Sequence, residues 1–188
     1  MSSPEGNMVA RRLIRFAAAA SLAAAAAGCF QPLYTQRPVT GASSIGEALA
    51  AVDVAQIPAP NGTPLARIAV ETRNELIFGI TGGSGAAPPT HRLNIRLVPT
   101  NTAVILDVFT NRPEFENFGL NADFSLVELV SGKSVLTATA AARVTYNVPG
   151  QQQRFARARG LHDAESQAAK VIADQIKSRL ASYFVAGT

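Results

Sequence analysis

Apolar and polar residues alternate through much of the second half of the chain. The alternation covers residues 93–97, 118–130 and 136–146, and a period of two is that of a strand with one buried and one solvent-facing side. Ser131-Gly132-Lys133 predicts a tight hairpin turn between the last two of these strands. The pattern therefore predicts an antiparallel meander with an apolar face that must be covered.

Proline marks the expected ends of the strands. A short first strand is predicted at residues 51–57, ahead of a Pro-rich turn. Residues 99–102 (Pro-Thr-Asn-Thr) are expected to break the second strand, which resumes over 104–109 as a separate strand or as a bulged continuation. Residues 111–114 predict a further turn.

Two segments carry the helical period. Thr63 can cap a helix that begins at Pro64, and apolar residues then recur at i, i+3, i+4 and i+7 as far as Leu76. Arg67 and Glu71 lie one turn apart on the outer face of this helix and are expected to pair.

A second helix is predicted over residues 161–184, where apolar side chains recur near every fourth position. These are Ala164, Ala168, Ile172, Ile176, Leu180 and Phe184. The order of elements predicts an α+β fold: a two-layer sandwich with two helices packed on one face of a mostly antiparallel sheet of about four strands.

A glycine-rich stretch, residues 79–89, separates the first helix from the strands. Gly82-Gly83-Ser84-Gly85 lacks the lysine of a phosphate-binding loop and follows a helix instead of opening one. A linker is therefore favoured over a phosphate site.

The first 28 residues have the order of a secretory signal, in which a charged region precedes an alanine-rich apolar stretch. That stretch is too short to span a bilayer, which takes roughly 20 residues. Ala27 and Gly28 before Cys29 are the small residues that a lipoprotein signal peptidase requires. We predict a lipoprotein signal peptide over residues 1–28 and acylation of Cys29; the alternative is an incidental thiol after an ordinary secretory signal.

The remainder divides into an acylated N-terminus with its tether, residues 29–49, and a domain over residues 50–188. Acylation of Cys29 leaves no free thiol, which excludes disulfides and thiolate metal sites. Phe30, where aspartate would favour retention at the inner membrane, favours the outer membrane. Removing the leader, with its three arginines and Glu5, lowers the net charge from +4 to +2, which argues against a nucleic-acid partner.

Catalysis has little support in the sequence. His91 and His162 are the only histidines, and His162 and its neighbour Asp163 point in different directions if they lie on a helix. Neither Gly-x-Ser-x-Gly nor His-Glu-x-x-His occurs. We therefore predict no enzyme activity, no catalytic residue, no metal site and no cofactor.

Several short motifs resemble the LPS-assembly lipoprotein LptE family of alphaproteobacteria. They are Phe30-Gln31-Pro32-Leu33-Tyr34 after the cysteine, Arg73-Asn74-Glu75-Leu76, Tyr146, Phe155-Ala156, Asp163-Ala164-Glu165 with Ala168-Ala169, and the end from Leu180 to Phe184. The chain departs from the family pattern in lacking a further glycine after the cysteine and in having Phe155 where tyrosine is usual. The resemblance extends over nearly the whole mature chain.

The resemblance implies a role in outer-membrane assembly. LptE-like lipoproteins sit inside the outer-membrane β-barrel LptD and support its assembly and the insertion of lipopolysaccharide into the outer leaflet. It implies LptD and lipopolysaccharide as partners and an acyl anchor on the periplasmic side of the outer membrane. The competing interpretation is an auxiliary lipoprotein of an envelope ABC-type phospholipid transport system, which would co-purify with an inner-membrane ATPase complex.

Arginines are the candidate lipopolysaccharide ligands, because guanidinium binds phosphate through two parallel N–H bonds. The candidates are Arg112, Arg143, Arg154, Arg157 and Arg159. The last three are expected to share one loop around Phe155. The resemblance places the family's ligand contacts near Arg112 and near Arg157 or Arg159; the alternative for each is a solvating surface arginine.

Overall fold

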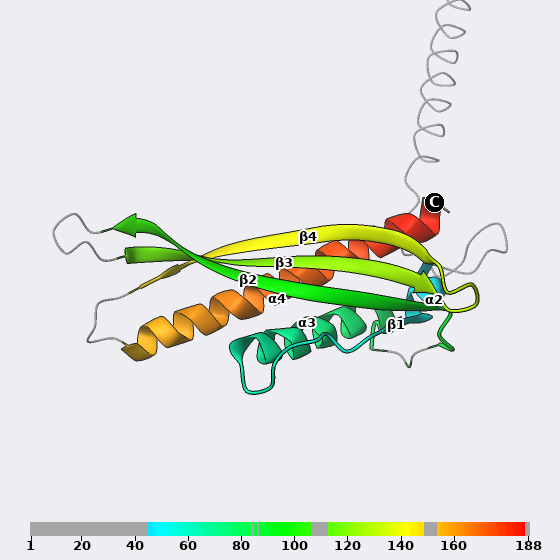
Figure 1. The fold of residues 1–188 in the computed structure, drawn as a ribbon, viewed down its shortest axis with the longest axis horizontal. Helices are drawn as coiled ribbons and strands as arrows, with labels where there is room; N and C mark the ends of the chain where they lie inside the picture. Colours follow the sequence, from blue (N-terminus) through cyan, green and yellow to red (C-terminus); the bar gives the residue numbers. More distant parts are fainter. Residues whose placement is uncertain (1–44, 84, 86, 107–112, 149–153, 187–188) are drawn as a thin grey trace, which may run out of the picture.

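A computed structural model describes residues 45–83, 85, 87–106, 113–148 and 154–186 of the 188-residue chain (Figure 1). The elements follow in the order α2 (Ile45–Ala50), β1 (Val52–Val54), α3 (Pro64–Thr81), β2 (His91–Leu106), β3 (Pro113–Glu128), β4 (Ser134–Asn147) and α4 (Arg154–Ala186). The short helix α2 lies in the segment that the sequence assigns to the tether.

The four strands form one sheet in the order β1-β2-β3-β4. β1 runs parallel to β2, and the other two pairs are antiparallel. α3 and α4 lie along the same face of this sheet (Figure 1). The predicted α+β sandwich, with a mostly antiparallel sheet of about four strands and two long helices on one face, is confirmed.

The core lies between the sheet and the two long helices. Each strand buries alternate side chains, and Leu93 pairs in register with Leu126, as Ile95 does with Phe124. α4 contributes Ala168, whose small side chain is fully buried. Close packing of alanine against the sheet is what the i+4 stripe of α4 predicts.

α3 begins where the sequence predicts. The Thr63 hydroxyl accepts a hydrogen bond from the Ala66 N–H at 3.3 Å, and Pro64 occupies the first turn. The helix continues through Gly79, beyond the expected end, because Ile80 extends the buried stripe. It ends at Gly82, whose φ of 62° is the left-handed conformation that closes a helix.

β2 runs unbroken through Pro99, so the predicted break at residues 99–102 is wrong. The strand instead has register shifts between Ala103 and Leu106, which agrees with the alternative of a bulged continuation. Pro99 pairs in register with Leu120 of β3. β1 accompanies β2 only as far as Leu93, and beyond that point the outer edge of β2 has no neighbouring strand among the described residues. Proline is tolerated at such an edge because no ladder hydrogen bond is lost there.

α4 begins at Arg154, seven residues before the predicted start. Its first residues are exposed, so they have no apolar stripe from which a helix could be predicted, although arginine and alanine favour a helix. Arg154, Arg157 and Arg159 consequently lie on a helix and not in a shared loop. On α3, Arg67 contacts Glu165 and His162 of α4 instead of pairing with Glu71.

Candidate functional site

The face of the sheet opposite α3 and α4 is covered by no other described element (Figure 1). The side chains that alternate with the core point toward this face, which we call the outer sheet face. Its residues include Arg92, Asn94, Arg96, Asn121, Asp123, Ser125, Thr137, Thr139, Arg143 and Thr145. This face is therefore broad, polar and open to solvent.

Hydrogen bonds between neighbouring strands organise the outer sheet face. Arg96 donates to the Asp123 carboxylate at 2.8 Å across a directly paired position. The Thr145 hydroxyl donates to the Asn117 side-chain oxygen at 2.5 Å. A cavity of about 420 Å³ lies beside Arg96 and Asp123 and extends to Gln56, after β1. These contacts connect side chains of β2 to β3 and of β3 to β4 across the outer sheet face.

Arg143 lies on the outer sheet face, opposite Gly119 of β3. It is exposed, and it forms no ion pair with another described residue. Of the predicted ligand arginines it is the only described one on this face.

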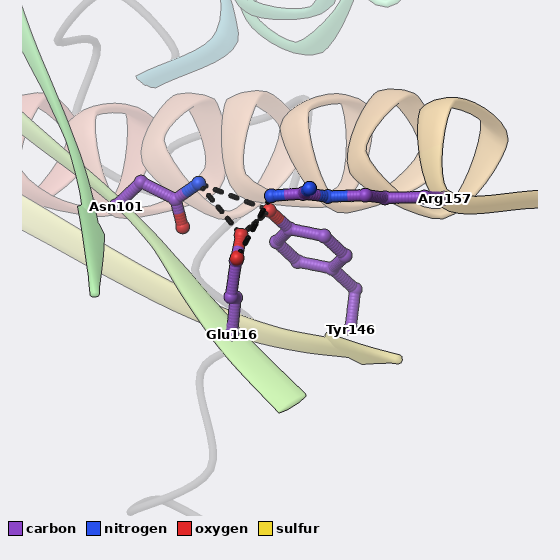
Figure 2. Close-up of polar contacts among 4 residues, drawn as sticks. All are labelled: Asn101, Glu116, Tyr146 and Arg157. Carbon is purple, nitrogen blue, oxygen red and sulfur yellow. Dashed lines mark hydrogen bonds and ion pairs between the residues drawn. The ribbon is translucent and has the colours of Figure 1, made fainter. Parts of the chain in front are cut away.

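A second polar group lies on the helix-covered side, at the end where α4 begins (Figure 2). Glu116 of β3 is 6% exposed. It accepts hydrogen bonds from the Asn101 side-chain amide at 3.0 Å, from the Tyr146 hydroxyl, and from Arg157 at 2.9 Å. Asn101 also donates to the Tyr146 hydroxyl at 2.9 Å. We call Asn101, Glu116, Tyr146 and Arg157 the Glu116 cluster.

The cluster keeps Glu116 ionised. Burial raises the pKa of the Glu116 carboxyl, but hydrogen bonds from Tyr146 and Asn101 and the charge of Arg157 outweigh it and hold that pKa below its ordinary value. Burial, together with the hydrogen bond to Glu116, raises the pKa of Tyr146. The cluster therefore joins an amide, a carboxylate, a neutral phenol and a guanidinium, taken from three strands and a helix.

The structure gives the predicted ligand arginines different surroundings. Arg157 is held by Glu116, whereas Arg154 and Arg159 are exposed in the first turns of α4. Arg143 lies on the other side of the sheet, so the described arginines do not converge on one site. Arg112 and the predicted lipidation residue Cys29 lie outside the described residues.

The positions of Glu116 and Tyr146 in the sequence indicate the Glu116 cluster, although the prediction of ligand arginines did not consider them. Glu116 precedes Phe118 by two residues, and Tyr146 ends the inward series of β4, so both occupy inward-facing positions. A carboxylate in an inward position requires hydrogen-bond partners. Which partners it has could not be predicted, because Arg157 is 41 residues away.

A third polar group joins α3 to α4. Arg67 contacts the ring of His162 and the carboxylate of Glu165, which is 4% exposed. Burial raises the pKa of the Glu165 carboxyl, and Glu71 adds to this, despite the opposing charge of Arg67. His162 therefore faces α3, and this group acts as a contact between two helices.

Neither a metal-binding cluster nor a membrane-spanning helix occurs in the part of the chain that the structure describes. No three His, Cys, Asp or Glu side chains come together there in a way that could hold a metal ion. No helix in those ranges is long and apolar enough to cross a bilayer.

No protein-family model matches the chain, and no curated protein matches it in sequence. Solved structures match its fold. A proposed lipoprotein from Caulobacter crescentus CB15, 17% identical, has a TM-score of 0.59 and covers 78% of this chain and 98% of its own. An uncharacterized lipoprotein B from Nitrosomonas europaea, 14% identical, has a TM-score of 0.52 and covers 72% and 86%. A minor lipoprotein from Acinetobacter baumannii, 13% identical, has a TM-score of 0.50 and covers 72% and 93%. The chain therefore has the fold of these bacterial lipoproteins.

Proposed function

We propose that this chain is a lipid-anchored outer-membrane protein of the LptE type, which plugs the LptD β-barrel and takes part in lipopolysaccharide transport to the outer leaflet. The observation that carries the proposal is the outer sheet face, a broad polar surface on a sheet whose other side is packed against helices. Such a surface suits a wet, polar partner better than a lipid one.

The interior of a wide outer-membrane barrel is such a partner. Barrel strands point apolar side chains at lipid and polar side chains at the lumen. The threonine, asparagine and charged side chains of the outer sheet face can exchange hydrogen bonds with water for hydrogen bonds with a polar wall. Because Arg96 and Asp123 are already paired, docking requires little further ordering of that part of the face.

The shared fold and the predicted lipidation support the same assignment. Lipoproteins from three bacteria have this fold, and Cys29 follows a signal with lipoprotein order. Acyl chains on Cys29 would hold the domain at the periplasmic surface of the outer membrane, next to the lumen of a barrel.

The candidates for contact with lipopolysaccharide are the predicted arginines whose side chains are exposed in the fold. Arg143, Arg154 and Arg159 are exposed, and each can form charge-assisted hydrogen bonds with phosphate. Arg112 stays a candidate from the sequence. Arg157 supports the site indirectly, because its bond to Glu116 holds the start of α4 against the sheet.

The test is affinity purification of the acylated protein from cell membranes, combined with site-specific photo-crosslinking. A crosslinker at Thr139, on the outer sheet face, is expected to capture LptD. The matched position is Lys170, which is exposed on α4, and it is expected to capture less. Recovery of an inner-membrane ATPase complex in place of a barrel would overturn the proposal.

A further inference from the structure

The hairpin between β3 and β4 carries two apolar side chains that are exposed to solvent. Val130 is 93% exposed and its neighbour Leu129 is 40% exposed. Turns normally hold glycine, asparagine, aspartate or serine, and a β-branched apolar residue at a turn contributes neither special backbone geometry nor hydrogen bonds. Val130 therefore has a side chain that the turn itself does not require.

The backbone of the hairpin is closed without the side chain of Val130. The Gly132 N–H donates to the Glu128 carbonyl at 2.8 Å, and the Glu128 N–H donates to the Lys133 carbonyl at 3.0 Å. The Ser131 hydroxyl donates to the Glu128 carboxylate at 2.6 Å. Gly132 supplies the left-handed residue, with a φ of 67°. A different residue at position 130 would leave this hairpin intact.

The hairpin lies at the end of the molecule where the chain enters from its N-terminal side (Figure 1). The Leu129 N–H donates to the Thr90 carbonyl at 2.9 Å, and the Thr90 N–H donates to the Ala51 carbonyl at 2.9 Å. Ala51 directly follows α2. Two hydrogen bonds therefore connect the hairpin, through Thr90, to the residue that directly follows α2.

The reach of that segment favours the hairpin end over the opposite end as the one next to the membrane. From Cys29 to Ile45 the chain takes sixteen residue steps, which span at most about 55 Å when fully extended. α4 has 33 residues, and at 1.5 Å per residue it is itself roughly 50 Å long. Only a nearly extended tether would bring the far end to the bilayer, whereas any shorter conformation keeps the hairpin end close to it.

The charge of the hairpin suits a phospholipid surface. Lys133 is exposed and forms no ion pair with another described residue. The nearby carboxylate of Glu128 accepts from Ser131 and so has a partner within the loop. An apolar tip beside a lysine matches the bilayer interface, where acyl chains lie beneath headgroup phosphates.

We propose that the hairpin end, formed by Leu129, Val130 and Lys133, inserts into the interface of the same leaflet that holds the acyl chains of Cys29. This second contact orients the domain, because it places the hairpin end at the bilayer and the Glu116 cluster at the opposite end of the molecule. The proposal rests on the acylation that the proposed function also requires, and it commits to lipid as the occupant of the tip.

The absence of tryptophan from the sequence makes a direct test available. Val130→Trp and Phe155→Trp place one probe at each end of the molecule; Phe155 is 91% exposed at the start of α4. Each acylated variant is reconstituted without a barrel into phosphatidylethanolamine–phosphatidylglycerol vesicles, with or without brominated acyl chains. Emission from position 130 is expected to shift to the blue and to be quenched by bromine, while emission from position 155 stays red and unquenched.

The outcomes separate the two proposals. Flotation with the vesicles but no quenching at position 130, or equal quenching at both positions, overturns the hairpin proposal and leaves the lipid anchor standing. Failure of the acylated protein to float overturns the anchor, and the hairpin proposal with it. Circular dichroism of both variants shows that the probes have not altered the fold, and Val130→Asp, tested with a probe at Leu129, is expected to abolish the quenching.

Discussion

Glu116 shows how one residue can connect every layer of this fold. Its carboxylate lies in an inward-facing position of β3, where desolvation opposes the charged form, and its partners come from β2, β4 and α4. The hydrogen bonds and the charge of the guanidinium outweigh desolvation, since the pKa of Glu116 is lowered and not raised. The charge is therefore retained in the fold because its partners are in place.

Glu116→Gln is expected to lower the free energy of unfolding by about 1–3 kcal/mol at neutral pH, because Arg157 and Tyr146 lose a charged acceptor. A lowered folded-state pKa means that the contribution of Glu116 is complete above its ordinary value of 4.5 and is lost as the pH falls through the lower folded value. Urea unfolding should therefore show a difference at pH 7 that shrinks below pH 4.5.

Asp123→Asn is the matched control for this prediction. Asp123 also pairs with an arginine across the sheet, but its side chain is 50% exposed, so the expected cost is below about 1 kcal/mol. Glu165 acts in the opposite sense: its raised pKa makes the fold lose stability as the pH rises above 4.5. The contribution of Glu116 is therefore measured as the difference in the free energy of unfolding between Glu116→Gln and the parent protein. If this difference did not depend on pH, the lowered pKa assigned to Glu116 would be contradicted.

The arginines at the start of α4 separate into ligand candidates and a structural one. Reversing both Arg154 and Arg159 to glutamate is expected to weaken lipopolysaccharide binding by at least about tenfold, because hydrogen bonds between charged groups contribute about 1.5–3 kcal/mol. Arg179→Glu, an exposed reversal near the other end of α4, is the control and should leave binding unchanged. Pull-down on immobilised lipopolysaccharide measures both.

Arg157→Glu should behave differently from these reversals. It places a second carboxylate beside Glu116 and is expected to destabilise the domain. Loss of lipopolysaccharide binding in this variant with unchanged unfolding would assign Arg157 to the ligand and contradict its role in the Glu116 cluster.

At the scale of elements, the sequence predicts best where burial alone decides the structure. The strands with a period of two and the buried stripe of α3 follow directly from their apolar positions. Two features do not follow from apolar positions. β2 continues through Pro99 because its outer edge has no neighbouring strand there among the described residues. The first turns of α4 are accompanied by the contact of Arg157 with Glu116. Both features depend on neighbours that are distant in the sequence, so no local pattern predicts them.

β4 is an edge strand, and α4 covers part of its open side. The Gln175 side chain accepts from the Ala141 N–H at 3.1 Å and donates to the Ala141 carbonyl at 3.0 Å. Gln175→Ala is expected to cost about 1 kcal/mol and to promote self-association through the exposed edge. Urea unfolding and light scattering measure the two effects.

Gln167→Ala provides the comparison, since Gln167 lies on the same helix and bonds only Asp163 of its own helix in the described structure. It should change neither stability nor association appreciably. Equal effects of the two substitutions would show that the edge contact of Gln175 has no special role.

The covering helix as a whole depends on its buried stripe. Ile172 is fully buried beneath α4, so Ile172→Asp is expected to cost more than about 4 kcal/mol by leaving an unpaired charge in the core. Val171→Asp, one residue away and 41% exposed, should cost only about 0.5 kcal/mol. Thermal unfolding followed by circular dichroism distinguishes them, and similar midpoints would contradict the assigned helix face.

At the scale of the whole molecule, the two faces of the sheet and the two ends of the domain differ in character. One face of the sheet is packed against α3 and α4, and the other presents polar side chains to solvent. One end carries the β3–β4 hairpin and α2, while the other carries the Glu116 cluster and the first turns of α4 (Figure 1). This polarity suits a domain that is fixed at a membrane by one end and docks through its outer sheet face.

Cys29→Ala tests this organisation by removing the anchor without touching the domain. The core residues of the described structure all lie between Leu49 and Ala181, so we expect unfolding by urea to be unchanged. Each methylene of a lost acyl chain removes about 0.8 kcal/mol of membrane affinity, and the variant is therefore expected in the soluble periplasmic fraction, without incorporated palmitate.

Co-purification with LptD should fall with dilution, since a tethered domain docks as if at high local concentration whereas a free one does not. Palmitate labelling that survived the substitution would contradict acylation at Cys29, and undiminished co-purification at every dilution would show that docking of the outer sheet face needs no anchor.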